Sequence, residues 1–274
     1  PVGFLTLLKK IRVSYDDKRD MVAQSATELS RAVRQMLAPA AGSRMPMDNV
    51  VDRAVSSGKA RFDGVHGGIT GAHKFPSSLP VRLLLRYHRR NDDPSSLKMA
   101  ALTLEKMAAG GMNDQVGGGF HRYSTDAQWL VPHFEKMLYD NALLVPAYIE
   151  GWQATGNPRF KQVAIKTLDY VVREMTSPDG AFFSATDADS LTPSGHRDEG
   201  WFFTWTREEV SDVLGTDDDR IAAAVYGVDT GGNFEGRNVL YLPRELDSAA
   251  GDLGLSTVQL ASDLDRINAA LYAR

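Results

Sequence analysis

Apolar residues recur at helical spacing along the N-terminal part of the chain. Within residues 4–11 they lie three or four positions apart, and residues 16–37 carry about one apolar residue per helical turn among mostly polar neighbours. This period is typical of amphipathic helices, so both segments are predicted to be helical. Residues 79–90 are expected to form a further helix.

Two longer segments, residues 85–107 and 149–171, share one pattern at an offset of 64 positions. Pro94 aligns with Pro158, and Thr103 aligns with Thr167. Each copy contains a helix, a short turn that ends in Asp or Asn before Pro, and a second helix. Two-helix units in tandem predict an all-α fold of stacked helical hairpins.

Long connections follow the second helix of each unit, at residues 110–132 and 177–205. Because each connection follows the same helix of its unit, both are expected at one end of the stack, and this rim is where chemistry is expected. Residues 181–190 and 200–205 alternate between apolar and polar types, which predicts a small β-hairpin in this rim.

The first connection leads into a segment rich in ionisable side chains. Pro132 suits the first position of a helix, which would place His133 and Asp140 on one helical face two turns apart. These two side chains could then point into a cavity. Alternatively, Glu135 caps the helix, Lys136 and Asp140 form a surface pair, and His133 is a satisfied core residue.

Three consecutive glycines at positions 117–119 precede a cluster of aromatic and polar side chains. Glycine there permits positive φ or a close approach to the main chain. A phosphate-binding loop would need a preceding strand, a following helix and a Lys, so nucleotide binding is disfavoured. Trp129 and Tyr123, interleaved with His121 and Asp126, could form a sugar-binding surface or could simply pack in the core.

Acidic residues flank the expected hairpin. Asp187, Asp189 and Glu199 could act as acid and base or share a cation. They could equally belong to a surface turn rich in Asp, Ser, Pro and Gly.

Composition narrows the possible partners. The net charge of −4 over 274 residues gives no basic field for nucleic acid, and no apolar run is long enough for a membrane helix. We therefore expect neither nucleic acid nor membrane as a partner, and a cytoplasmic location. The chain has no cysteine, so a disulfide or a thiolate metal site is excluded. No cofactor or metal is implied.

Several segments together resemble a known family, the thioredoxin-domain-containing proteins related to spermatogenesis-associated protein 20. The segments that carry this resemblance are residues 74–76, 114–124, 129–142, 187–190, 199–200, 205–206 and 232–236. The sequence departs from the family pattern at His73, where Pro is expected, and in a longer loop between Ser190 and Glu199.

The resemblance implies an N-terminal thioredoxin-like domain followed by an (α/α)6 toroid of the six-hairpin glycosidase type, similar to N-acylglucosamine 2-epimerase. Residues 1–42 would then be a helical linker from a thioredoxin-like domain that is missing here. Residues 43–274 would form an incomplete toroid.

These expectations give two hypotheses for function. In the first, the domain acts on a sugar in the toroid funnel. Epimerisation would use His121 and His133 with Asp140 as the orienting group, and hydrolysis would use two carboxylates from Asp126, Glu135, Asp140 and Asp187. In the second, the domain is a non-catalytic binding or regulatory platform attached to a thioredoxin-like redox domain, so whether the chain is an enzyme stays open.

The predicted site has two groups of residues. The candidate catalytic residues are His133, His121, Asp140 and Glu135. The candidate substrate-binding residues are Trp129, Tyr123, Asp126, Asp187, Asp189, Glu199 and Trp205.

Overall fold

The computed structural model describes residues 3–38 and 49–274. The chain divides into two compact units, Pro1–Val50 and Val51–Arg274, and each is described by itself. The boundary predicted between residues 42 and 43 lies outside the described residues.

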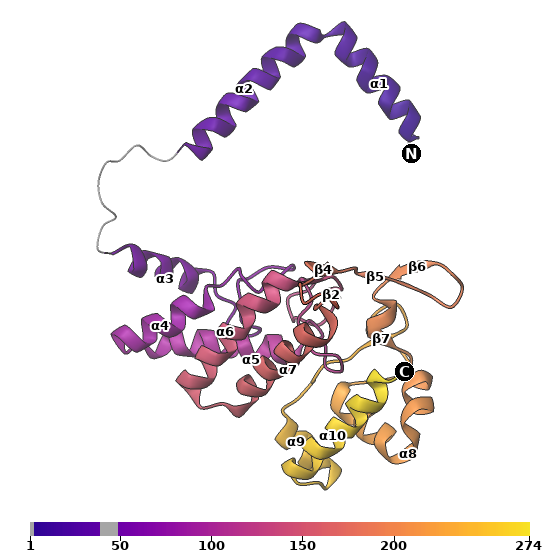
Figure 1. The fold of residues 1–274 in the computed structure, drawn as a ribbon. Coiled ribbons are helices and arrows are strands. Elements are labelled where there is room, and N and C mark those ends of the chain that lie inside the picture. Colours follow the sequence, from indigo (N-terminus) through magenta and orange to yellow (C-terminus); the bar gives the residue numbers. More distant parts are fainter. Residues whose placement is uncertain (1–2, 39–48) are drawn as a thin grey trace. The chain divides into compact units, whose positions relative to one another are not determined.

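The N-terminal unit contains two amphipathic helices, drawn in indigo in Figure 1. They are α1 (Phe4–Asp17) and α2 (Arg19–Leu37), which confirms the helices expected from the apolar spacing. Neither helix buries a side chain. Within the described residues, no helix has the length and the apolar composition that crossing a membrane requires.

The second unit is built mainly from helices that pack in antiparallel pairs, which confirms the all-α prediction (Figure 1). Helix α4 packs on α5, α6 packs on α7, and α8 packs on α10. The bounds are α3 (Val50–Ala60), α4 (Val81–Asn91), α5 (Pro94–Ala109), α6 (Leu138–Thr155), α7 (Pro158–Glu174), α8 (Arg207–Tyr226), α9 (Leu246–Leu253) and α10 (Thr257–Tyr272).

The two predicted repeats begin their second helices in the same way. The Asp93 side chain accepts a hydrogen bond from a first-turn N–H of α5, and the Asn157 side chain does the same for α7. Pro94 and Pro158 follow at the first helical position, where the missing N–H costs nothing. The repeat seen in the sequence is therefore a repeat of helical hairpins.

Short antiparallel strand pairs join the long connections. They are β1 (Tyr123–Ser124) with β2 (Pro132–His133), β3 (Lys136–Met137) with β4 (Ala185–Thr186), β5 (Asp189–Leu191) with β6 (Arg197–Glu199), and β7 (Thr204–Trp205) with β8 (Asn238–Val239). Strand β3, which follows shortly after the first predicted connection, pairs with β4 in the second, so the two connections lie at the same end. The shared rim is thus present in the structure.

The predicted β-hairpin exists, but its strands differ from those expected. Residues 189–191 pair with 197–199, whereas residues 185–186 pair with β3 and residues 204–205 pair with β8. The turn contains Gly195 with φ of 84°. Alternation identifies an extended segment, but the partner of a two-residue strand depends on contacts distant in sequence.

The helix predicted to begin at Pro132 is wrong at its start, because α6 begins at Leu138. Residues 132–137 are extended and pair on both sides, so their backbone groups are satisfied by β1 and β4. His133 and Asp140 therefore do not share a helical face. The surface pair expected between Lys136 and Asp140 is also absent, since both side chains have other partners.

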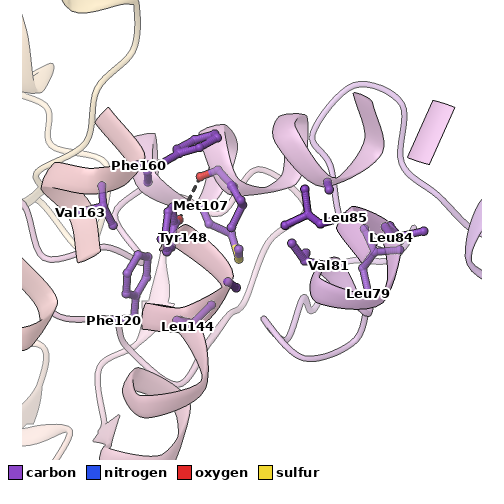
Figure 2. Close-up of a cluster of buried hydrophobic side chains, with 14 of the residues drawn as sticks. Leu79, Val81, Leu84, Leu85, Met107, Phe120, Leu144, Tyr148, Phe160 and Val163 are labelled. Carbon is purple, nitrogen blue, oxygen red and sulfur yellow. Dashed lines mark hydrogen bonds between the residues drawn. The ribbon is translucent and has the colours of Figure 1, made fainter. Parts of the chain in front are cut away.

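Two main hydrophobic clusters form the interior of the second unit. The first lies among α4 to α7, where the Tyr148 hydroxyl donates a hydrogen bond to the Leu104 carbonyl (Figure 2). The second lies among α8, α9 and α10, and includes the fully buried Ile267. A smaller cluster around Phe134 contains Ala188 and Val239.

Candidate functional site: a cavity beside a lysine-clamped loop

A loop held by a buried ion pair forms one side of the candidate site. The Asp114 carboxylate accepts hydrogen bonds from the N–H groups of Val116 at 3.0 Å and Gly117 at 2.8 Å. Its second oxygen accepts from the Lys136 Nζ at 2.7 Å, and Lys136 also donates to the Gly118 carbonyl at 2.9 Å. The lysine thus ties both ends of the loop together in a nearly solvent-free position.

Glycine is required at the end of this loop. Gly118 and Gly119 have φ values of 77° and 76°, which non-glycine residues rarely adopt. A Cβ at Gly119 would lie 2.4 Å from Cδ1 of Tyr170, because that ring packs directly on the main chain. The Lys136 ammonium lies 4.4 Å from the centre of the same ring. The loop, the lysine and the tyrosine form one packed group.

The same construction occurs once more, at Asp63. The Asp63 carboxylate accepts from two loop N–H groups and from Lys74, which also donates to the Gly67 carbonyl at 2.7 Å. The ring packed against Gly68 is that of Trp129. We call these two segments, residues 63–74 and 114–136, the first and second Asp–Lys loops. Their aspartates lie 51 positions apart.

Burial and the ion pair between Asp114 and Lys136 determine the protonation states of the groups beside the second Asp–Lys loop. Burial alone would raise the pKa of Asp114, but Lys136 and the loop N–H groups outweigh it and hold the pKa below its ordinary value. Burial, together with the positive charge of Lys136, lowers the pKa of His121 to about 3. His121 is therefore neutral at pH 7.

One ring nitrogen of His121 forms a hydrogen bond within the protein, and the other does not. Its Nδ1 lies 2.9 Å from the Phe134 carbonyl oxygen, so the neutral ring carries its proton there and donates. Nε2 then has a free lone pair, and it forms no hydrogen bond within the part of the chain that the structure describes. His121 also lines the cavity, so this acceptor is available to a ligand.

A cavity of about 630 Å³ lies between the second Asp–Lys loop and the C-terminal helices. The 3-10 turn η1 (Trp201–Phe203) and strand β7 contribute an aromatic wall. Charged and hydroxyl side chains complete the lining. The lining includes Asp114, His121, Lys136, Tyr170, Arg173, Thr186, Asp187, Trp201, Phe202, Phe203, Trp205, Glu209 and Arg237.

A second polar group surrounds His133, which is not among the residues that line the cavity. Its Nδ1 lies 2.6 Å from the Glu199 carboxylate, and its ring stacks on Tyr123 with centroids 5.2 Å apart. Glu135 lies 3.9 Å from the other ring nitrogen of His133. The structure therefore brings Glu199 to the segment that carries Tyr123, His133 and Glu135, although Glu199 lies 66 positions after His133.

Asp140 joins this second group through Arg122. The guanidinium is 2.9 Å from the Asp140 carboxylate and 3.5 Å from that of Glu135. Burial raises the pKa of Asp140, and Arg122 opposes this rise. Asp140 does not contact His133 through any hydrogen bond in the described residues, so its expected role as an orienting partner for His133 is not seen.

Two of the predicted binding residues have structural partners instead. Trp129 is fully buried, and its indole N–H donates to the His66 carbonyl at 2.8 Å, so no ring face is open to a sugar. Asp126 accepts hydrogen bonds from the N–H groups of Gln128, Leu130 and Val131, which stabilise its own loop. Core packing and turn formation account for both residues.

The hairpin acids are also separated. Asp187 lines the cavity, where its carboxylate pairs with Arg197. Asp189 lies opposite Glu199 in the β5–β6 pair and is exposed. Among residues 3–38 and 49–274, no group of three or more His, Asp or Glu side chains is arranged to hold a metal ion.

Several cavity residues were missed from the sequence, chiefly Asp114, Lys136, Tyr170 and Thr186. One signal could have revealed Asp114, because both Asp–Lys loops contain Asp, Val and a Gly pair at equal spacing. Nothing local marks the other three, since the lysine follows the aspartate by 11 positions in the first loop and by 22 in the second. Tyr170 lies within a regular helical pattern, and Thr186 lies in the two-residue strand β4.

Comparison with known proteins finds homologues over nearly the whole chain. Human spermatogenesis-associated protein 20 is 36% identical over 93% of this chain and 36% of its own length. The rat protein of the same name is 37% identical over 78% of this chain and 28% of its own length. The chain thus spans about a third of the curated relatives it matches, and the resemblance inferred from the sequence is confirmed for that part. No protein-family model matches the chain.

Similar solved structures include sugar epimerases and family 76 glycoside hydrolases. A sugar epimerase from a ruminal bacterium aligns with 80% of this chain and 67% of its own at 15% identity, with a TM-score of 0.44. A cellobiose 2-epimerase from Bacillus thermoamylovorans aligns with 81% of this chain and 70% of its own at 12% identity, with a TM-score of 0.44.

Proposed function

We propose that residues 51–274 form a carbohydrate-active domain that binds a mono- or disaccharide in the cavity beside the second Asp–Lys loop. One observation carries this proposal: a cavity of about 630 Å³ combines an aromatic wall with hydroxyl, imidazole and charged groups. That volume is in the range of small-molecule sites. Aromatic faces suit the apolar side of a sugar ring, and the polar groups suit its hydroxyls.

The contacts follow from the lining. Trp201 and Trp205 supply ring faces, and the Nε2 lone pair of His121 accepts a hydrogen bond from a sugar hydroxyl. On the side of the cavity formed by C-terminal residues, the Arg237 guanidinium donates a hydrogen bond to the Glu209 carboxylate at 2.7 Å. Paired charges of this kind orient hydroxyls without leaving an isolated charge in a partly buried site.

Of the two reaction classes, the geometry favours epimerisation. Every carboxylate proposed for hydrolysis is engaged: Asp126 by loop N–H groups, Glu135 and Asp140 by Arg122, and Asp187 by Arg197. His121 instead lines the cavity with a ring nitrogen that has no hydrogen-bond partner among the described residues, so it is the proposed group that takes the proton from the carbon next to the carbonyl and returns it to the opposite face. His133 lies in the neighbouring group and is not proposed as its partner.

Deuterium exchange tests this function directly. In D₂O with glucose, mannose, N-acetylglucosamine or cellobiose, epimerisation replaces hydrogen by deuterium at the carbon next to the carbonyl, which NMR detects. His121→Gln should reduce exchange by about 100-fold, consistent with loss of a general base. His196→Gln, in the exposed hairpin turn, is the matched control and should exchange like the unmodified protein.

The outcomes separate the alternatives. New reducing ends without deuterium incorporation would indicate a hydrolase. Sugar binding without turnover in the unmodified protein would favour a non-catalytic platform, joined in the longer protein to a thioredoxin-like domain. The mutual pairing of Asp114 with Lys136 and of Glu209 with Arg237 is the observation that favours this second candidate, because satisfied ion pairs also serve purely structural roles.

A further inference from the structure

One hydroxyl in the cavity is buried without a partner. The Tyr170 side chain is 3% exposed, and its hydroxyl makes no hydrogen bond to any described residue. The Thr186 hydroxyl is also buried, and it too makes no hydrogen bond to any described residue. Thr186 also lines the cavity. The pKa of Tyr170 is raised to about 12, chiefly by burial; an interaction with the Thr186 hydroxyl opposes this rise, so the two hydroxyls are neighbours although they do not reach hydrogen-bonding geometry.

Buried polar groups in folded proteins are almost always paired. An unpaired hydroxyl loses its bonds to water and gains none in return, so each exception calls for an explanation. Two such groups side by side, in a chain whose remaining buried side-chain polar atoms are paired in the described residues, point to a ligand.

The two Asp–Lys loops provide an internal comparison. In the first, the ring that packs on Gly68 belongs to Trp129, whose N–H is satisfied by the His66 carbonyl. In the second, the ring that packs on Gly119 belongs to Tyr170, whose hydroxyl is left unpaired beside the cavity. The first loop shows that this packing can be built with its ring polar group satisfied. The unpaired hydroxyl is therefore not a by-product of the loop construction.

The charges near these hydroxyls indicate a neutral ligand. The Lys136 ammonium lies 4.4 Å from the centre of the Tyr170 ring and is paired with Asp114 at 2.7 Å, and Arg173, which also lines the cavity, is paired with Glu174 at 2.9 Å. This end of the cavity thus offers no unpaired positive charge to a phosphate or a carboxylate. A hydroxyl group can both donate and accept, so it fits between two protein hydroxyls in either arrangement.

We propose that the hydroxyls of Tyr170 and Thr186 form an anchoring subsite that binds one hydroxyl of a neutral sugar. This assignment rests on the proposed carbohydrate function and adds the specificity-determining contacts to it. The second Asp–Lys loop serves as the rigid support, since its glycines and Lys136 hold the tyrosine ring in place. Tyr170 and Thr186 contact the substrate, and the loop positions them.

Calorimetric titration of the full chain with the four sugars named above tests the subsite. For a sugar that binds, Tyr170→Phe and Thr186→Val should each weaken affinity about 5- to 10-fold, the loss expected for one neutral hydrogen bond. Tyr170→Phe should leave the melting temperature unchanged or raise it, because it removes an unpaired buried hydroxyl. Tyr226→Phe is the matched control: its hydroxyl is bonded to Asn268 at 2.7 Å, so the melting temperature should fall and the affinity should stay constant.

Each result has a distinct meaning. Binding to the unmodified chain with unchanged affinity in both variants would overturn the subsite and leave the proposed function standing. No binding of any of the four sugars would overturn both. A deoxy sugar that lacks the contacted hydroxyl should bind the unmodified chain more weakly than the parent sugar does, and this loss should be smaller in Tyr170→Phe, where only Thr186 still contacts the hydroxyl. Equal losses in both proteins would also overturn the subsite.

Discussion

At the scale of single residues, burial decides which of the two candidate histidines is neutral and lines the cavity. His121 and His133 lie twelve positions apart in one segment and had equal claims from the sequence. His121 is enclosed by Phe134 and Phe203, with its Nδ1 bonded to a carbonyl, whereas His133 is partly exposed and faces Glu199. Only His121 is therefore held neutral in the cavity.

The low pKa of His121 predicts a pH dependence of stability. The folded-state pKa of about 3 lies below the unfolded value of 6.5, so the unfolded chain binds the extra proton in that window. Stability should be complete above pH 6.5 and fall toward pH 3, by at most about 1.4 kcal/mol per pH unit. Urea unfolding measured at pH 7, 6, 5 and 4.5 gives this slope.

Replacing the His121 imidazole tests whether His121 causes this pH dependence of stability. His121→Asn keeps a donor for the Phe134 carbonyl but cannot take up a proton, so its stability should change less with pH between 6.5 and 4.5. Asp63, whose folded pKa is about 2 against 3.8, loses its contribution only as pH falls below about 4, outside this range. An identical slope in the variant and the unmodified protein would contradict the assignment to His121.

At the scale of elements, the Asp–Lys loops show how two glycines define a binding wall. Each loop turns through a pair of positive-φ glycines, and the second glycine accepts an aromatic ring on its bare Cα. The lysine then closes the loop from inside. The Tyr170 ring forms part of the cavity wall, and it can occupy its position only because Gly119 has no side chain.

Adding a methyl group at Gly119 should lower the stability of the fold. Gly119→Ala has a strained φ and places Cβ 2.4 Å from Tyr170, so strain of about 1–2 kcal/mol adds to overpacking of about 1–3 kcal/mol. Gly180→Ala has a similar φ of 81° but no atom within 4 Å of the new Cβ, and should show the strain alone. Chemical denaturation of both variants measures the difference. Equal losses of stability would show that the ring does not rest on Gly119.

At the scale of the second unit, the cavity lies where two separate cores meet. Tyr170 lies on α7, which contributes Phe160 and Val163 to the first cluster, whereas Leu271 belongs to the second cluster and Trp205 packs against it. Few backbone contacts join the two sides directly, among them the hydrogen bond from the Leu242 N–H to the Ala109 carbonyl at 2.7 Å. A bound ligand would add further contacts across this junction.

Ligand binding should therefore protect both halves at once. Hydrogen exchange measured by mass spectrometry, with and without a bound sugar, should slow in residues 114–122 and also in the last turns of α10. Residues 81–91 of α4, which do not line the cavity, are the internal reference and should exchange at the same rate in both states. Protection confined to one half would show that the ligand does not bridge the cores.

The sequence by itself determined the helices, the repeated hairpins, the capped Pro turns and the end at which the long connections gather. These features depend on periodicity and on residues adjacent in the chain, so they can be recognised locally. The tertiary structure decided that residues 132–137 are extended, that Lys136 pairs with Asp114 instead of Asp140, and that Trp129 is core while Tyr170 faces the cavity. Those outcomes depend on which distant groups are desolvated together, and the energies of such contacts leave no mark on local spacing.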